Sequence, residues 1–106
     1  MPIASGTLFA KGDAYVAKFK LIVGEILVEY TFTFGLAVDD FDVSSHSARV
    51  SYTNLNQLAN GEQIFRAQFG KTEFKMTMLN DVEIRGTLDN HSGISMASNG
   101  TGVWNH

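Results

Sequence analysis

The chain contains no cysteine and only one proline among its 106 residues. Without cysteine it can form no disulfide, offer no thiolate to zinc and use no cysteine nucleophile. Long hydrophobic runs are also missing, since the uncharged stretch 30–38 is only about half as long as a membrane-spanning helix requires. Mean hydropathy is −0.01. These absences exclude a disulfide-stapled scaffold and a membrane protein built from apolar helices.

Basic residues are fewer than acidic ones. Lys and Arg number 8 against 11 Asp and Glu, so the net charge is −3 and the pI is about 5.4. The basic residues are scattered along the sequence among acidic ones, and we therefore expect no basic patch. Binding of nucleic acid through phosphate neutralisation is not expected from an acidic chain of this kind.

The sequence does hold enough apolar material, 44% of its residues, for one core. A chain of this length buries roughly 65% of the surface that its unfolded form exposes, and residues 1–106 are predicted to form a single domain. The strongest pattern is a hairpin over 15–34 that turns at Val23-Gly24-Glu25. One face of it is apolar and comprises Tyr15, Ala17, Phe19, Leu21 and Val23, then Ile26, Val28, Tyr30, Phe32 and Phe34. This period of two indicates strands with one buried face, and lysines opposite glutamates are expected to pair on the outer face.

Similar alternation recurs through the rest of the chain. Together with the hairpin, it predicts strands at 3–9, 15–23, 25–34, 48–53, 62–69, 73–78, 82–88 and 92–104, and 41–43 is a further candidate for a short strand. Turns are expected at 11–13 and 44–47. Within 53–60 the alternation breaks, and Thr53 or Asn54 is predicted to cap one helical turn whose Leu55 and Leu58 face the core.

Eight short strands with almost no helix predict an all-β protein, an eight-stranded antiparallel β-barrel of Greek-key or up-and-down topology. Eight is the number at which a closed sheet can just be filled by its own side chains, and closure removes exposed edges. A two-sheet β-sandwich is the alternative. Gly86 and Gly102 are expected where the barrel bends or another backbone comes close.

No residue pattern in the chain indicates catalysis or a metal ion. The acidic loop with Asp39, Asp40 and Asp42 lacks the ligand spacing of a calcium loop, and is interpreted as a solvated loop. His46 and His91 lie in Ser- and Asp-rich segments, and 89–92 contains the residue types of a nucleophilic triad. Triads are assembled from different elements, so turn residues with local hydrogen bonds are the favoured interpretation. We expect no catalytic residue, no metal and no cofactor, and the sequence favours a protein that is not an enzyme.

Aromatic side chains and methionines supply a large apolar interior, which has two interpretations. In the favoured one the side chains simply fill the barrel, and Trp104 closes one end of it. In the other, the barrel is lipocalin-like or cyclase-like and holds an apolar small molecule. The residues predicted to line such a site are Tyr30, Phe32, Phe69, Phe74 and Trp104.

Three stretches in the second half of the chain also support a family resemblance. They are Thr53-Asn54-Leu55-Asn56-Gln57-Leu58, the pair 74–81 and 84–88, and the glycine-rich end formed by 93–95 and 100–104. With these stretches the chain resembles the virulence-associated protein (Vap) family of actinobacterial pathogens. The resemblance implies a compact eight-stranded barrel, a non-enzymatic effector secreted into the host phagocytic compartment, and action on a partner or a membrane. It brings no catalytic residue to this chain.

The expected cellular location and the expected partner differ between these interpretations. A secreted protein is expected if the resemblance holds, and a cytoplasmic one if Met1 is the natural start, because Met1 to Gly6 contains no basic segment followed by an apolar one. The leading hypothesis is a surface-interacting barrel that binds a protein partner or a membrane. The alternative is a carrier of an apolar small molecule.

Overall fold

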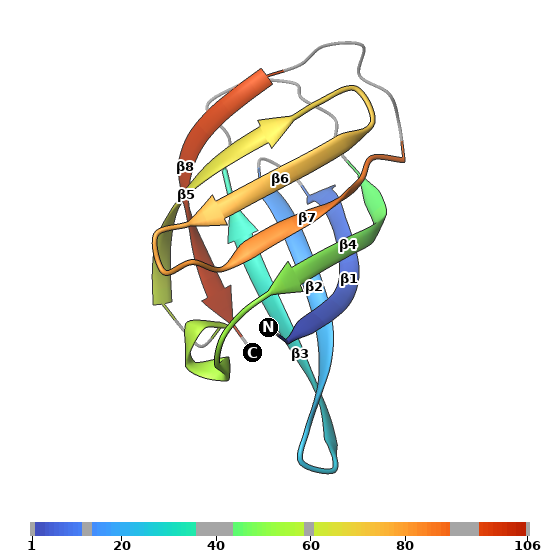
Figure 1. Ribbon diagram of the computed structural model, residues 1–106, viewed down its shortest axis with the longest axis vertical. Helices are drawn as coiled ribbons and strands as arrows, with labels where there is room; N and C mark the ends of the chain where they lie inside the picture. Colours follow the sequence, from blue (N-terminus) through green and yellow to red (C-terminus); the bar gives the residue numbers. More distant parts are fainter. Residues whose placement is uncertain (1, 12–13, 36–43, 59–60, 90–95, 106) are drawn as a thin grey trace.

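A computed structural model describes residues 2–11, 14–35, 44–58, 61–89 and 96–105 as a closed antiparallel barrel of eight strands (Figure 1). The strands are β1 (Ile3–Lys11), β2 (Ala14–Val23), β3 (Ile26–Phe34), β4 (Ser45–Ser51), β5 (Gly61–Phe69), β6 (Glu73–Met78), β7 (Glu83–Thr87) and β8 (Met96–Asn105). One 3₁₀ turn, η1 (Leu55–Leu58), links β4 to β5. The predicted all-β barrel is therefore confirmed, and the two-sheet alternative was wrong.

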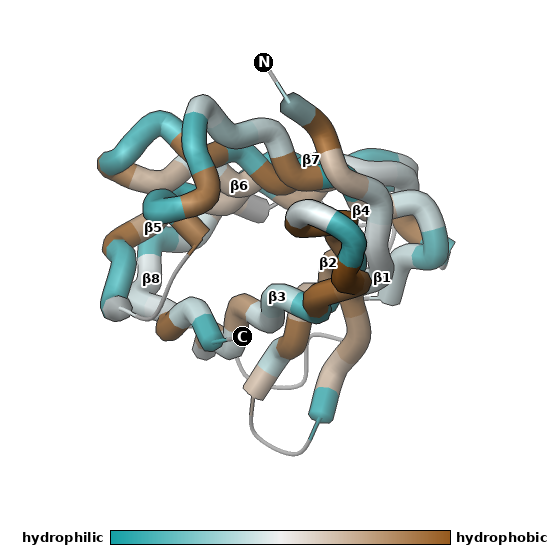
Figure 2. The backbone as a smooth tube through the Cα atoms, turned by 90° about the horizontal axis from the view of Figure 1, so that it is seen from below, coloured by the Kyte–Doolittle hydropathy of each residue, from teal (hydrophilic) through white to brown (hydrophobic). Residues whose placement is uncertain are grey.

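The order of the strands around the barrel is β1-β2-β3-β8-β5-β6-β7-β4. Two meanders, β1-β2-β3 and β5-β6-β7, are joined by β8 on one side and by β4 on the other. Seen from below, the strands form a closed ring (Figure 2). Because β8 and β4 each lie between strands that do not neighbour them in the chain, the barrel is of the Greek-key rather than the up-and-down type.

The inward faces predicted from alternation form the core. Phe32 and Trp104 are fully buried, and their ring centroids lie 4.9 Å apart. Phe34 meets Phe65 edge to face at 5.3 Å. Alternate residues of β5, β6 and β7, with Val82 just before β7, complete the interior; they are Phe65, Ala67, Phe69, Phe74, Met76, Met78, Val82 and Ile84. Burial of these side chains is the main term that stabilises the barrel.

The predicted helical turn is confirmed, and its polar residues explain it. The Asn54 side chain accepts a hydrogen bond from the backbone of Asn56 at 3.0 Å, and the Gln57 side chain accepts one from the backbone of Asn54 at 3.1 Å. This reciprocal arrangement caps the first turn. Gln57 also donates to the carbonyl of Asn80 at 2.7 Å, which fastens η1 to the β6–β7 turn. Leu58 is buried and Leu55 packs against the core.

Two local expectations were wrong. Residues 45–47 of the turn predicted at 44–47 are instead the first residues of β4. The buried Ser45 hydroxyl donates a hydrogen bond to the Thr87 carbonyl at 2.6 Å, so this polar group has its partner within the sheet and need not face solvent in a turn. Ile26, predicted to face inward, is 69% exposed because the hairpin extends beyond the barrel. The short strand at 41–43, the acidic loop and His91 lie outside the described residues.

The glycines predicted to mark close approaches do so in two ways. A Cβ on Gly86 would lie 2.8 Å from the carbonyl oxygen of Ser47, so β7 and β4 come together too tightly there for a side chain. A Cβ on Gly102 would meet the ring of Phe32 instead of another backbone. Glycine at the second position leaves room for a core aromatic ring.

Candidate functional site

The end of the β2–β3 hairpin projects from the barrel (Figure 1). The two strands pair with each other from Tyr15 and Phe34 to the turn, but β1 accompanies β2 only to Phe19, and β8 accompanies β3 only from Thr31. Residues 20–30 are therefore a two-stranded ribbon, called here the β2–β3 ribbon, and neither of its edges pairs with another described strand. It is one reason why the molecule measures 41 Å along its longest axis and only 26 and 23 Å across.

Exposed apolar side chains gather at the tip of this ribbon. Ile22 is 76% exposed, Ile26 69% and Leu27 62%. Ile22 and Leu27 stand directly opposite each other on one face, whereas Ile26 alternates onto the other. A short ribbon gains little stability from apolar groups left in water. Exposure on both faces therefore points to an interaction rather than to folding.

Charged residues divide the ribbon into two zones. Lys20 stands opposite Glu29 at the base, and the Lys18 ammonium lies 3.9 Å from the Glu29 carboxylate. The predicted pairing of lysine with glutamate is thus confirmed. At the tip, Glu25 is the one charged residue, in a two-residue turn whose Gly24 has φ +67°, as a type II′ turn requires of its first central residue.

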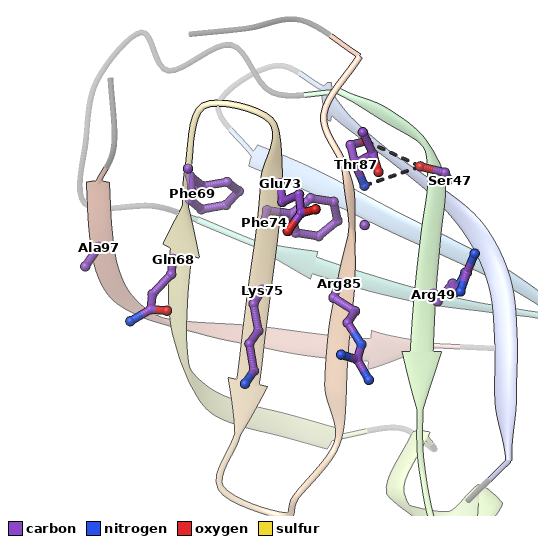
Figure 3. Close-up of a pocket in the computed structure, with 12 residues that line it drawn as sticks. Ser47, Arg49, Gln68, Phe69, Glu73, Phe74, Lys75, Arg85, Thr87 and Ala97 are labelled. Carbon is purple, nitrogen blue, oxygen red and sulfur yellow. Dashed lines mark hydrogen bonds between the residues drawn. The ribbon is translucent and has the colours of Figure 1, made fainter. Parts of the chain in front are cut away.

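A second feature lies on the outer face of β6, β7 and β4. The register places Lys75 directly opposite Arg85, and Arg85 directly opposite Arg49. These three exposed side chains, called here the cationic row, stand side by side on adjacent strands (Figure 3). The basic residues are scattered along the sequence but not in the structure, because strand pairing brings these three together. The expectation of no basic patch was therefore wrong for this face.

Acidic partners neutralise this row only in part. Glu83 contacts both neighbours, with its carboxylate 3.2 Å from Arg85 Nε and 3.7 Å from Lys75 Nζ. Within the part of the chain that the structure describes, Arg49 forms no ion pair. Glu83 thus forms ion pairs with two of the three cations, and the charge of Arg49 is exposed to solvent.

A groove of about 940 Å³ runs beside the cationic row. All three cations line it together with Glu73, whereas the rings of Phe69 and Phe74 are 1% and 3% exposed and stack inside the barrel with centroids 6.0 Å apart. Gly86 contributes only backbone. The charged side chains along the groove thus have both signs, and the groove lies toward the end of the barrel away from the ribbon (Figures 1 and 3).

His46 is paired with Asp89. His46 Nδ1 lies 2.5 Å from one carboxylate oxygen of Asp89, and the His46 backbone donates to the other oxygen at 3.2 Å. Among the described residues no hydroxyl bonds to this ring, and both Ser45 and Ser47 donate to the Thr87 carbonyl instead. The pair therefore links the start of β4 to the residue two positions after β7. The expectation of turn residues with local hydrogen bonds was wrong for His46, because it lies in β4 and its partner is 43 positions away in the sequence.

The five residues predicted for an interior ligand occupy two places. Tyr30, Phe32 and Trp104 belong to the packed core, where Phe32 and Trp104 contact each other. Phe69 and Phe74 are also buried, and their rings lie inside the barrel behind the groove. Binding of an apolar molecule by the five together stays a prediction. Trp104 sits near the end of β8, at the end of the barrel from which the ribbon projects (Figure 1).

Replacing Arg49 with glutamine should stabilise the fold slightly. Like charges directly opposite in a sheet destabilise it by about 0.2–1 kcal/mol, and Arg49 offers no described ion pair in return. We expect the melting temperature of the variant to be about 1–4 °C higher than that of the parent at low salt. The difference should shrink in about 0.5 M salt because screening weakens the repulsion. A lower melting temperature for Arg49→Gln would contradict the view that the row is electrostatically unfavourable.

Comparison with known proteins gives no match to a family model, to a curated protein or to a solved structure. None of the helices that the structure describes is long and apolar enough to cross a bilayer. Nor do the described residues contain a group of three His, Asp or Glu placed to hold a metal ion. A function must therefore be argued from the ribbon and the groove themselves.

Proposed function

We propose that this protein is a non-enzymatic barrel that acts through its outer surface, and that the β2–β3 ribbon binds it to a membrane surface. The observation that carries the proposal is the exposure of Ile22 and Leu27 on one face of the ribbon tip and of Ile26 on the other. A folded protein partner would cover one face of so narrow a ribbon. An apolar layer into which the tip is immersed covers both.

The dimensions of the ribbon fit an interfacial depth. Strands rise about 3.3 Å per residue, so the segment beyond the Lys20–Glu29 pair is about 10 Å long. Amphipathic elements that lie at the membrane interface bury their apolar side by about 5–10 Å. The Lys20–Glu29 pair would then lie at the level of the head groups, where charged groups remain hydrated.

The expected affinity is modest. Complete burial of an Ile or Leu side chain contributes about 1.5–3 kcal/mol, so three side chains supply on the order of 5 kcal/mol. Dehydrating Glu25 and the open backbone groups of the turn opposes insertion. Binding should therefore be reversible and should increase when the carboxylate of Glu25 is removed.

The proposal is tested by co-sedimentation with neutral and anionic vesicles at acid and neutral pH. We expect the unaltered protein to bind, the triple variant Ile22→Ser, Ile26→Ser, Leu27→Ser to lose most of that binding, and Glu25→Gln to bind more strongly. A matched control is Ile64→Ser with Leu79→Ser, since these residues are 54% and 76% exposed elsewhere on the barrel.

Two results would remove the membrane proposal. One is the absence of vesicle binding at every lipid composition and pH. The other is a ribbon that mediates self-association in solution, seen as a concentration-dependent mass that the triple variant abolishes, while vesicles bind neither form. The second result would assign the ribbon to a protein contact.

A further inference from the structure

We infer that the outer face of β6, β5 and β8 binds a second copy of this chain, through a two-fold contact centred on Ile64. This face forms one flank of the barrel, whereas the tip of the β2–β3 ribbon projects beyond one end (Figure 1). Three features of the face support the contact, namely exposed apolar side chains, the lack of charge along β8, and the opposite charges of Glu62 and Arg66. None of them depends on membrane binding.

Three exposed apolar side chains lie close together on this face. Ile64 is 54% exposed, Leu79 76% and Val103 41%. The backbone of Leu79 donates to the Ile64 carbonyl at 3.2 Å, which places these two residues side by side. Ile64 pairs with Thr101, so Val103 is its diagonal neighbour on β8, at a distance of about 7–8 Å. Single exposed apolar residues are ordinary, but a group of them marks an interaction site.

The strand beside Ile64 carries no charge. β8 contains no Asp, Glu, Lys or Arg, although its outward side chains are exposed. These side chains are Ala97, Asn99, Thr101, Val103 and Asn105. The outward residues of β3 that pair with this strand, Thr31 and Thr33, are uncharged as well. Depletion of charge is typical of the centre of a protein–protein interface.

Two residues of opposite charge flank Ile64 along β5. Glu62 and Arg66 are both exposed and stand two positions to either side of it on the same face, which is about 7 Å along the strand in each direction. Among the described residues, neither forms an ion pair. The face therefore presents a negative, an apolar and a positive group in line, and neither charge is compensated within the molecule.

This order of groups fits a second copy of the same chain. A two-fold axis that crosses β5 at Ile64, at right angles to the strand, lays Ile64 of one copy against Ile64 of the other. It also sets Glu62 of each copy opposite Arg66 of the other, so that one surface supplies two ion pairs. Such self-complementarity is what an isologous dimer requires. Insertion of this face into a membrane would instead dehydrate both charges without pairing them.

The contact should be weak and reversible. Three strands spaced about 4.8 Å apart form a smaller patch than the roughly 800 Å² per partner that a standard interface buries. We therefore expect a dissociation constant on the order of 0.1–1 mM, as suits the small interfaces of transient complexes.

Sedimentation equilibrium on the full chain tests the contact, over a concentration range from about 10 µM to about 1 mM that spans such a constant. We expect the weight-average mass to rise from 11.6 kDa toward twice that value as the concentration increases. Ile64→Ser with Leu79→Ser should keep the mass of the monomer throughout. A constant mass of 11.6 kDa for the unaltered protein overturns the inference.

Charge reversal tests the pairing itself. Two copies of Glu62→Arg would oppose only cations at the contact, and two copies of Arg66→Glu only anions, so each variant alone should associate at least about tenfold more weakly. A mixture of the two variants opposes unlike charges and should regain association, as should the double variant Glu62→Arg, Arg66→Glu. A mixture that associates no better than its components overturns the two-fold arrangement.

Two controls match these changes in net charge. Glu73→Arg and Lys11→Glu alter exposed residues outside the contact, and each should leave the dissociation constant within about twofold. A loss of association in the controls equal to that in the test variants would show an effect of net charge alone and would overturn the inference.

Failure of this inference can be told apart from failure of the membrane proposal. The triple serine variant of the β2–β3 ribbon should self-associate as the unaltered protein does. Ile64→Ser with Leu79→Ser should still sediment with vesicles, because the ribbon is unchanged. Loss of self-association in the ribbon variant would assign the contact to the ribbon and overturn its assignment to Ile64.

Discussion

Replacing Gly6 with alanine is expected to destabilise the barrel by about 4 kcal/mol or more, enough to unfold a large share of a small domain whose total stability is about 5–15 kcal/mol. Gly6 in β1 stands opposite Phe19 in β2. A Cβ at this position would fall on the backbone carbonyl oxygen of Lys18 and 2.6 Å from the Phe19 ring. A backbone oxygen within a paired strand cannot rotate away, and β1 is also held by β4 on its other side.

Urea unfolding monitored by circular dichroism would measure this effect. Ser5→Ala is the control, since Ser5 is the exposed neighbour in the same strand and should change stability by less than about 0.5 kcal/mol. An unfolding free energy for Gly6→Ala within 1 kcal/mol of the parent would show that β1 and β2 can separate at this point. The tight pairing described for these strands would then be incorrect.

Phe32→Ala is expected to reduce stability by about 3–5 kcal/mol, the range observed for truncating a buried aromatic residue. The ring is fully buried and contacts the rings of Trp104, Phe34 and Phe65 at 4.9, 5.6 and 5.9 Å. Its removal leaves a cavity in the middle of the aromatic cluster. Trp104 is the one tryptophan of the chain, so its fluorescence reports on this cavity directly during unfolding.

A companion variant makes the same experiment more specific. Because a Cβ on Gly102 would meet the Phe32 ring, Gly102→Ala should be strongly destabilising by itself but much less so when Phe32 is already alanine. The two changes should therefore show an interaction energy of about 1–3 kcal/mol. Additive effects would contradict the contact. Thr31→Ala, on the outer face of the same strand, should lower stability by less than about 1 kcal/mol.

Features that depend on neighbouring residues in the sequence were predictable. Alternation identified the buried faces of β2, β3, β5 and β6, and Asn54 was one of the two caps predicted for η1, because strand faces and helix caps are set by side chains a few positions apart. The capping role of Gln57 was not predicted. The errors at Ser45 and Ile26 have one cause. Alternation within one strand does not show where the neighbouring strand begins or stops. Whether Ser45 is paired and whether Ile26 is covered both depend on that neighbour.

Features that depend on the order of strands were not predictable from these patterns. The cationic row exists because β4 pairs with β7, which places Arg49 next to Arg85. A count of charges along the sequence contains no trace of this proximity. For the same reason the groove is lined by cations that had no predicted role, while Phe69 and Phe74, predicted as interior residues, are buried behind it.

The place of β8 between β3 and β5 determines when this protein can become a barrel during its synthesis. Both meanders can pair internally while the ribosome is still at work, but each keeps an unsatisfied edge until Met96–Asn105 has emerged and hydrogen-bonded to both. Barrels closed by such distant segments fold slowly, and exposed strand edges favour wrong pairing between nascent chains. Pairing of β8 thus closes the barrel, and the protein is most prone to aggregate during the interval in which both meanders have formed and β8 is still unpaired.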